Sequence, residues 1–335
     1  MMPFPYYSGD GKAPREPVEL PEINRSAEDD PTHYRPDDGL RMAVNVALMV
    51  GQPLLLTGVP GTGKTQLAYS VAHELGLGAP LRFQARTTSK GRDLLYTYDA
   101  LGRLHAAQSQ LDVRPVNFIR YGALGHAILR SHKPDDIKNL LPGGEPHLGP
   151  VRCVVLIDEI DKAPRDFPND LLAELEELCF SVPELDEPGH PARVQAEPGL
   201  RPIVIITSNS EKHLPDAFLR RCAYYDIPAP DRIRLKEILD RRLGALAGKE
   251  SPFVNSALDL FEDLRSGGLV RSPSTAELLG WVRAIRRRFP DDADPLSTRP
   301  ELGAEMLSLL VKNPGDAALA RQIIAASRRK KGKRD

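Results

Sequence analysis

The sequence contains few cysteines and no excess of charge of either sign. Its three cysteines, Cys153, Cys179 and Cys222, are odd in number and widely spaced among 335 residues. Such a set argues against a disulfide framework and for a reducing compartment. The sequence also lacks a CxxC pair or a His/Cys cluster that would indicate a zinc site. Lys and Arg total 45 against 46 Asp and Glu, a net charge of -1. Because proteins that coat nucleic acid usually carry a basic excess, this balance argues against nucleic acid as a partner.

Long apolar runs are lacking as well. The longest apolar stretch, residues 42–56, is interrupted by Asn45, Gln52 and Pro53, so it is too short and too polar to span a bilayer. Residues 1–22 contain no apolar segment of the kind found in secretory signals. With 41% hydrophobic and 27% charged residues, the composition is that of a globular protein. We therefore expect a soluble, cytoplasmic protein that does not insert into a membrane.

The length suits a mid-sized domain followed by a smaller one. Residues 1–37 are rich in Pro, Asp and Glu and predict an extended leader. Residues 38–230 alternate apolar strand patterns with helical patterns, and no strand pattern follows. We therefore expect an α/β domain over 38–230, a helical lid domain over 231–328 and a basic tail over 329–335.

Short apolar segments separated by helical patterns predict a parallel sheet flanked by helices. The expected strands are 54–57, 81–85, 153–159, 203–207 and 223–227. The expected helices of this domain are 38–50, 64–75, 122–131, 166–179 and 215–221. Alternating residues followed by a turn predict a β-hairpin insertion near 94–106, and a Pro-rich segment predicts a second one near 181–200.

The segment GVPGTGKT, residues 58–65, carries the motif GxxxxGK[ST] in full, directly between a predicted strand and a predicted helix. Backbone N–H groups of such a loop cradle phosphate oxygens, and a helix N-terminus adds its positive dipole end. Lys64 is expected to reach the β- and γ-phosphates and Thr65 to ligate Mg²⁺. The alternative is a chance glycine-rich turn. The remaining predicted nucleotide-binding residues are Gly58, Pro60, Gly61, Thr62, Gly63 and Gln66.

Two adjacent acids, Asp158 and Glu159, end the buried strand CVVLIDE. Asp158 is expected to hold the Mg²⁺ shell and Glu159 to deprotonate an attacking water. Without the upstream phosphate loop, the same pair of acids would indicate only a solvated strand end. Glu159 matters most, because a nucleotide hydrolase needs a base.

Two further polar features follow the next strands. Asn209 comes just after IVIIT, where a side chain can bond the γ-phosphate or the lytic water; the alternative is a capping asparagine. Arg220 and Arg221 stand at a predicted helix end, where arginine can stabilise charge on a transferred phosphoryl group, often in a neighbouring subunit. The alternative is an ordinary cationic helix C-terminus.

Taken together, GVPGTGKT, CVVLIDE, IITSN and LPDAFLRRC, followed by a helical domain, resemble the Walker A, Walker B, sensor 1 and arginine-finger regions of the AAA+ ATPases. The resemblance covers about residues 36–330. Within AAA+, the chain is most similar to the MoxR family, in a divergent branch. The supporting stretches are AVNVALMVGQPLLLTGVPGTGKT, YGALGHAIL and LIDEIDKAP. The two predicted hairpins fall where this clade carries its helix-2 insert and its pre-sensor-1 hairpin.

The resemblance implies a role for each matching residue. Lys64 and Thr65 bind ATP and Mg²⁺, Asp158 coordinates the metal, Glu159 is the catalytic base and Asn209 is sensor 1. Nucleotide hydrolysis to ADP and phosphate is the implied activity.

The two arginine roles that the resemblance implies, finger and sensor 2, match the family's motifs less closely. Arg220 or Arg221 is the finger that acts in trans, and we favour Arg221 because Arg-Cys resembles the ending of this motif in some clamp-loader subunits. Many MoxR proteins carry Ser-Pro-Arg at a lid helix, which supplies a sensor 2 arginine. Here Ser274 stands at that position, and Arg271 is the substitute candidate, the alternative being an ordinary loop arginine.

MoxR-like proteins resemble chaperones that form rings, usually hexamers, and often act with a von Willebrand factor A domain partner. Remodelling of a protein client is therefore the first hypothesis. A nucleotide-gated switch is the second, although an intact Glu159 argues against it. A motor on DNA or RNA is the third, with a basic patch that could line a ring pore or be a solvated face, namely Arg86, Lys90, Arg92 and Arg103. A small-molecule kinase would leave the helical lid unexplained.

Overall fold

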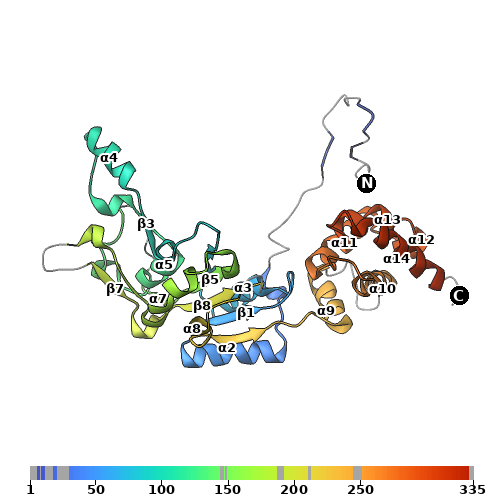
Figure 1. Cartoon of the computed structure of the whole chain (residues 1–335), viewed down its shortest axis with the longest axis horizontal. Helices are drawn as coiled ribbons and strands as arrows, with labels where there is room; N and C mark the ends of the chain where they lie inside the picture. The colour runs from blue at the N-terminus through green and yellow to red at the C-terminus, as the bar shows by residue number, and fades with distance from the viewer. Residues whose placement is uncertain are drawn as a thin grey trace. The chain divides into compact units, whose positions relative to one another are not determined.

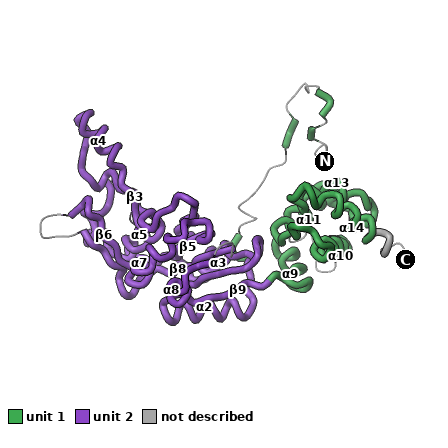
Figure 2. The backbone as a smooth tube through the Cα atoms, in the orientation of Figure 1, with its two compact units in different colours: residues 1–33, 229–335 green, residues 34–228 purple. Residues whose placement is uncertain are grey.

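The structure is a computed structural model, and its described residues fall into two compact units, residues 34–228 and residues 1–33 with 229–335 (Figure 2). The described residues are 6–7, 9–11, 18–20, 30–143, 147, 149–186, 192–209, 213–243 and 251–331. Most of the predicted leader and residues 332–335 of the predicted tail lie outside these ranges.

The first unit is built on a parallel sheet, which confirms the predicted α/β class. Among the described residues its strand order is β2-β5-β8-β1-β9, and every neighbouring pair is parallel. The strands are β1 (Leu54–Thr57), β2 (Leu81–Gln84), β5 (Val154–Asp158), β8 (Ile203–Thr207) and β9 (Ala223–Asp226). The middle three strands are almost wholly buried, as expected for a sheet covered on both faces.

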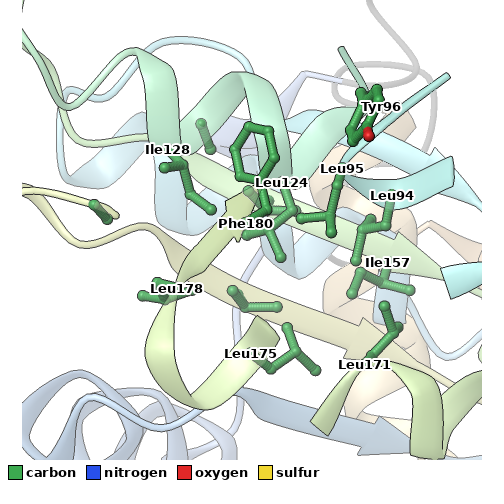
Figure 3. Close-up of a cluster of buried hydrophobic side chains, with 14 of the residues drawn as sticks. Leu94, Leu95, Tyr96, Leu124, Ile128, Ile157, Leu171, Leu175, Leu178 and Phe180 are labelled. Carbon is green, nitrogen blue, oxygen red and sulfur yellow. The ribbon is translucent and has the colours of Figure 1, made fainter. Parts of the chain in front are cut away.

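Helices cover both faces of this sheet because successive strand residues point to opposite sides. Leu54 and Leu56 of β1 pack with α2 (Asp38–Val50) and α3 (Lys64–Glu74). Leu55 faces the other layer, whose buried cluster is shown in part in Figure 3. That layer contains α5 (Ala123–Leu129), α6 (Phe167–Asp170), α7 (Leu172–Glu177) and α8 (Asp216–Leu219).

An arm projects from this unit, with α4 (Ala100–Gln108) at its end (Figure 1). At its base β3 (Tyr96–Tyr98) pairs antiparallel with β4 (Ile119–Tyr121). The prediction of a hairpin within 94–106 is therefore wrong. The alternation covers one strand only, and Asp99 then caps a helix by accepting the N–H of Gly102 at 2.7 Å.

A second antiparallel pair joins β6 (Cys179–Ser181) to β7 (Arg193–Gln195). The segment 187–191 between them lies outside the described residues. The single helix predicted over 166–179 is instead the two short helices α6 and α7, and it ends earlier because Leu178 adopts a left-handed φ of 51° before Cys179 enters the strand.

The second unit contains a helical bundle. Its core centres on Trp281 of α11, with Phe253 and Phe261 of α10 fully buried in the same cluster. Its helices are α9 (Arg232–Leu243), α10 (Pro252–Ser266), α11 (Thr275–Arg288), α12 (Pro295–Thr298), α13 (Leu302–Glu305) and α14 (Asp316–Lys331). Within the described ranges, no helix of either unit is long and apolar enough to cross a membrane.

Candidate nucleotide-binding site

The loop between β1 and α3 depends on three glycines with positive φ. These angles are 133° at Gly58, 83° at Gly61 and 87° at Gly63, values that other residues rarely adopt. A Cβ atom at Gly58 would lie 2.6 Å from the carbonyl oxygen of Ile227. The close turn therefore requires glycine, and it brings the loop to the first turn of α3, where unpaired N–H groups favour a phosphate.

The other predicted loop residues surround this turn. Pro60 is exposed, while Thr62 and Gln66 are half-buried. The Thr62 hydroxyl donates to the carbonyl oxygen of Val59 at 3.0 Å, which closes the loop on itself. An additional side chain that the sequence did not single out is Tyr34, whose ring lies 2.9 Å from where a Gly63 Cβ would be.

Replacing Gly58 by alanine is expected to destabilise the unit and weaken nucleotide binding. The new methyl group would meet the Ile227 oxygen, so the loop must move, at a cost of about 2–4 kcal/mol. Gly76→Ala is the matched control, since Gly76 has a φ of 66° but no atom within 4 Å of its added Cβ. It should cost only about 1–2 kcal/mol. Thermal unfolding measures the stability of both variants. Equal losses of stability in Gly58→Ala and Gly76→Ala would contradict the predicted clash.

Lys64 begins α3, and only 7% of it is exposed. Its Nζ donates to the carbonyl oxygens of Gly58 at 2.6 Å and Val59 at 3.2 Å. Burial lowers the pKa of this ammonium below its usual 10.5. Negative charges oppose that shift, those of Asp161, Asp158, Asp226 and Glu159. A buried cation held by carbonyl oxygens of the loop is well placed to receive an anion.

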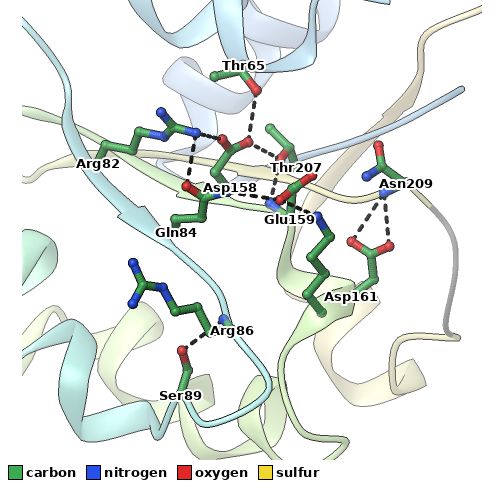
Figure 4. Close-up of polar contacts among 11 residues, drawn as sticks. Thr65, Arg82, Gln84, Arg86, Ser89, Asp158, Glu159, Asp161, Thr207 and Asn209 are labelled. Carbon is green, nitrogen blue, oxygen red and sulfur yellow. Dashed lines mark hydrogen bonds and ion pairs between the residues drawn. The ribbon is translucent and has the colours of Figure 1, made fainter. Parts of the chain in front are cut away.

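The carboxylate of Asp158 joins four elements (Figure 4). Its Oδ1 accepts the hydroxyl of Thr65 on α3 at 2.9 Å and that of Thr207 on β8 at 2.7 Å. Its Oδ2 pairs with Nη2 of Arg82 on β2 at 2.6 Å. The Asp158 side chain is 4% exposed, so these contacts supply the polar partners that a buried carboxylate needs.

Glu159 follows directly and has the left-handed φ of 58°, uncommon for a residue with a side chain. Its N–H donates to Thr207 Oγ1 at 2.9 Å, which holds this turn. Its Oε2 accepts Nε2 of Gln84 at 3.1 Å and pairs with Nζ of Lys162 at 2.7 Å. The side chain is therefore fixed at the carboxyl edge of the sheet, beside Asp158.

Asn209 lies at the same edge, because β8 runs between β5 and β1. Its N–H lies 3.2 Å from both carboxylate oxygens of Asp161. Figure 4 shows this contact between Asn209 and Asp161, which lies two residues after Glu159. The loop, β5 and β8 thus all contribute residues to the carboxyl edge of the sheet.

Arg220 and Arg221 lie at the other end of the strands. Both precede Ala223, the first residue of β9, which is in register with Leu54, the first residue of β1. The phosphate loop follows the last residue of β1, Thr57. The length of a four-residue strand, roughly 13 Å, therefore separates the level of these arginines from that of the loop.

The two arginines differ in their surroundings. Arg221 Nε pairs with Glu176 Oε2 at 3.0 Å, and its Nη1 donates to the carbonyl oxygen of Ala217 at 3.1 Å. Arg220 caps α8, with its N–H donating to Asp216. Both are exposed at this edge, so neither is buried in the unit's own core.

The candidate sensor 2 residue, Arg271, belongs to the helical unit. Its guanidinium lies 3.7 Å from Glu277, and its N–H donates to Asp316 at 3.0 Å. Ser274, four positions before Leu278 in the same region, caps α11 by a reciprocal pair of hydrogen bonds with Glu277. The serine at this position thus stabilises the start of α11.

Two of the four basic residues of the predicted patch, Arg92 and Arg103, make side-chain contacts within the unit. Arg92 pairs with Glu184 and lies over the ring of Tyr96. Arg103 donates to the hydroxyl of Tyr98 at 3.0 Å and to a backbone oxygen. The guanidinium groups of these two residues are therefore held by neighbouring side chains and backbone, which argues against a basic surface formed by all four residues.

The sheet, its glycine loop and the paired acids define a nucleotide-binding protein of the phosphate-loop class. The chain matches the family described as "AAA: ATPase family associated with various cellular activities (AAA)" over residues 54–226, just over half of its length. The chain therefore belongs to the AAA ATPase family, whose general activity is ATP hydrolysis and whose members typically form oligomeric rings.

Comparison with curated proteins finds no match to this chain. Among solved structures, one similar chain is the RuvB Holliday junction branch migration motor of Thermotoga maritima. The identity is 15%, the TM-score is 0.40, and the match covers 81% of this chain and 67% of that one. So distant a likeness carries no argument about function.

Proposed function

We propose that this chain is a Mg²⁺-dependent ATPase of the MoxR type, which assembles as a ring, most simply a hexamer, and remodels a protein partner in the cytoplasm. The observation that carries the proposal is the separation of the arginines from the phosphate loop. Because Arg221 and the loop lie at opposite ends of β1, the arginine of one subunit suits the nucleotide of the next. A complete site then requires two copies of the chain.

Within one subunit, different residues at the carboxyl edge are proposed to bind the phosphates and the Mg²⁺ ion. Lys64 exchanges its carbonyl partners for phosphate oxygens, because its buried charge gains more from an anion. Thr65 and Asp158 offer the hydroxyl and carboxylate oxygens that suit Mg²⁺, which when bound would neutralise charge on the phosphates. Both are oxygen ligands, the type that a hard cation prefers.

Glu159 is the proposed base. Its carboxylate is anchored by Gln84 and Lys162, so its second oxygen is left to accept a proton from a water. Asn209, at the same edge, is the residue proposed to orient that water or the terminal phosphate. Gln66, at the first turn of α3, and Arg271 are the remaining proposed contributors, the latter from the helical unit.

The proposed partner is a von Willebrand factor A domain protein, with a protein client. The support is the resemblance of the motif set, together with a projecting arm whose leucines are exposed at its end, Leu101 by 70% and Leu104 by 54%. Exposed apolar side chains on a projection are typical of a surface that contacts another protein. A nucleotide-gated switch would not need the fixed geometry of Glu159.

Mixing two inactive variants tests the shared site. Arg221→Ala lacks the finger and Glu159→Gln lacks the base, so each alone should hydrolyse ATP at a small fraction of the wild-type rate. At equal ratio, random mixing places an intact base beside an intact finger at about one interface in four, and about a quarter of the rate should return. Phosphate release measures it.

The control mixes Glu159→Gln with Arg220→Ala in place of Arg221→Ala. If Arg221 is the finger, Arg220→Ala should already be active alone. The ATPase rate of each mixture is compared with the summed rates of its two variants measured alone. If no mixture exceeds that sum, the sites are not shared between subunits, and the main support for a ring is removed.

A further inference from the structure

We propose that Arg82 is a resident counter-ion that competes with the divalent cation for Asp158, and so sets the Mg²⁺ concentration at which nucleotide binds tightly. The inference rests on the proposed function, since it needs Asp158 to serve a cation. It concerns a residue outside the phosphate-loop motif and outside the acidic pair.

The position of Arg82 follows from the sheet. β2 is the edge strand beside β5, and Gln84 of β2 is in register with Asp158. Arg82 lies two residues earlier, so both side chains stand on one face of β2. From there Arg82 reaches Asp158 Oδ2 at 2.6 Å, with the same nitrogen 3.4 Å from Gln84 Oε1.

The hydrogen bonds of Asp158 leave little room for a second cation. An ionised carboxylate has about four acceptor positions, two on each oxygen. Oδ1 already accepts the hydroxyls of Thr65 and Thr207, and Oδ2 holds Arg82. A cation or its bound water must therefore approach Oδ2, the oxygen that Arg82 occupies, where two positive charges repel.

The exposure of the two partners makes the exchange feasible. Asp158 is 4% exposed and depends on an opposite charge, whereas the Arg82 side chain is 42% exposed. The guanidinium can turn into solvent at little cost, because water rehydrates it and exposed ion pairs are weak. The carboxylate cannot do the same, so it exchanges one cation for another.

The arrangement also links the cation to Glu159. Arg82 lies next to Gln84, and Gln84 donates to Glu159. When Arg82 leaves Asp158 it also leaves Gln84 Oε1. The two acids that the proposed reaction needs are thus held by neighbouring side chains of a single strand.

The experiment measures binding of a fluorescent ADP to the full chain across a graded series of free Mg²⁺ concentrations. Arg82→Gln removes the competing charge, so half-saturation should occur at roughly three- to tenfold lower Mg²⁺ than in wild type. Arg82→Lys keeps the charge and should stay within about twofold of wild type. Arg41→Gln is the matched control, because it also removes an exposed arginine that pairs with an aspartate, Asp38, and it should change nothing.

Thermal unfolding supplies a second readout that needs no nucleotide turnover. In EDTA, Arg82→Gln leaves the buried Asp158 without this partner and should lower the melting temperature, and Mg²⁺ with ADP should raise it by more than in wild type. An unchanged or higher Mg²⁺ requirement in Arg82→Gln would overturn the inference while leaving the proposed function intact. If the wild type bound no ADP at any Mg²⁺ concentration, the proposed function and the inference would both be wrong.

Discussion

Glu159→Gln is expected to abolish ATP hydrolysis while leaving nucleotide binding intact. The substitution keeps the size and the hydrogen-bonding capacity of the side chain but removes its ability to take a proton from water. General bases contribute about 100- to 10,000-fold, so the rate should fall by at least about 100-fold. Steady-state phosphate release gives the rate, and titration with a fluorescent ATP analogue should give an affinity within about twofold of wild type.

Glu177→Gln is the matched control for this variant. Glu177 is also a glutamate that pairs with a cation, Arg193, but its side chain is 57% exposed and lies away from the acidic pair. Its hydrolysis rate should stay within about twofold of wild type. If Glu159→Gln retained more than about a tenth of the activity, Glu159 would not be the base.

Lys64→Ala is expected to weaken nucleotide binding strongly. The ammonium is buried beneath the loop, and a charge-assisted bond to phosphate in such a setting contributes about 1.5–3 kcal/mol. Affinity for ATP should therefore fall by about 10- to 150-fold, as measured by equilibrium titration. Hydrolysis should be lost with it, in contrast to Glu159→Gln, which loses hydrolysis alone.

Stability separates this effect from unfolding. Burial lowers the pKa of Lys64, so the folded state holds the charge at a cost that alanine does not have. The melting temperature of nucleotide-free Lys64→Ala should therefore not fall by more than a few degrees. Lys312→Ala is the control, because Lys312 also donates to a backbone oxygen, that of Ser308, but on an exposed surface. A large loss of stability in Lys64→Ala would mean that lost binding reflects a disrupted loop.

Much of the fold could be predicted because its signals are local. Each buried strand is a short apolar run bounded by loop residues, and α2 has both an aspartate cap, Asp37, and a left-handed glycine, Gly51, at its ends. The arm was predicted wrongly because alternation over Leu94, Tyr96 and Tyr98 identifies a strand but not its partner. That partner, β4, lies 20 or more residues further on.

Residues whose chemistry depends on their neighbours in the chain could be identified from the sequence. The glycine loop with Lys64 and Thr65 is one continuous motif, and Asp158 and Glu159 are adjacent at a strand end. Their types and spacing alone indicate a phosphate and a cation. The roles proposed for Arg221 and Asn209 needed in addition the order of the strands.

The contacts around these residues depend on the folding of the sheet. Arg82 and Thr207 contact Asp158 across separations of 76 and 49 positions. Nothing in the local sequence marks either residue, because β2 and β8 become neighbours of β5 only when the sheet assembles in the order β2-β5-β8-β1-β9. Parallel strands bring distant carboxyl ends to one edge, and that convergence places a cation and a hydroxyl on a buried carboxylate.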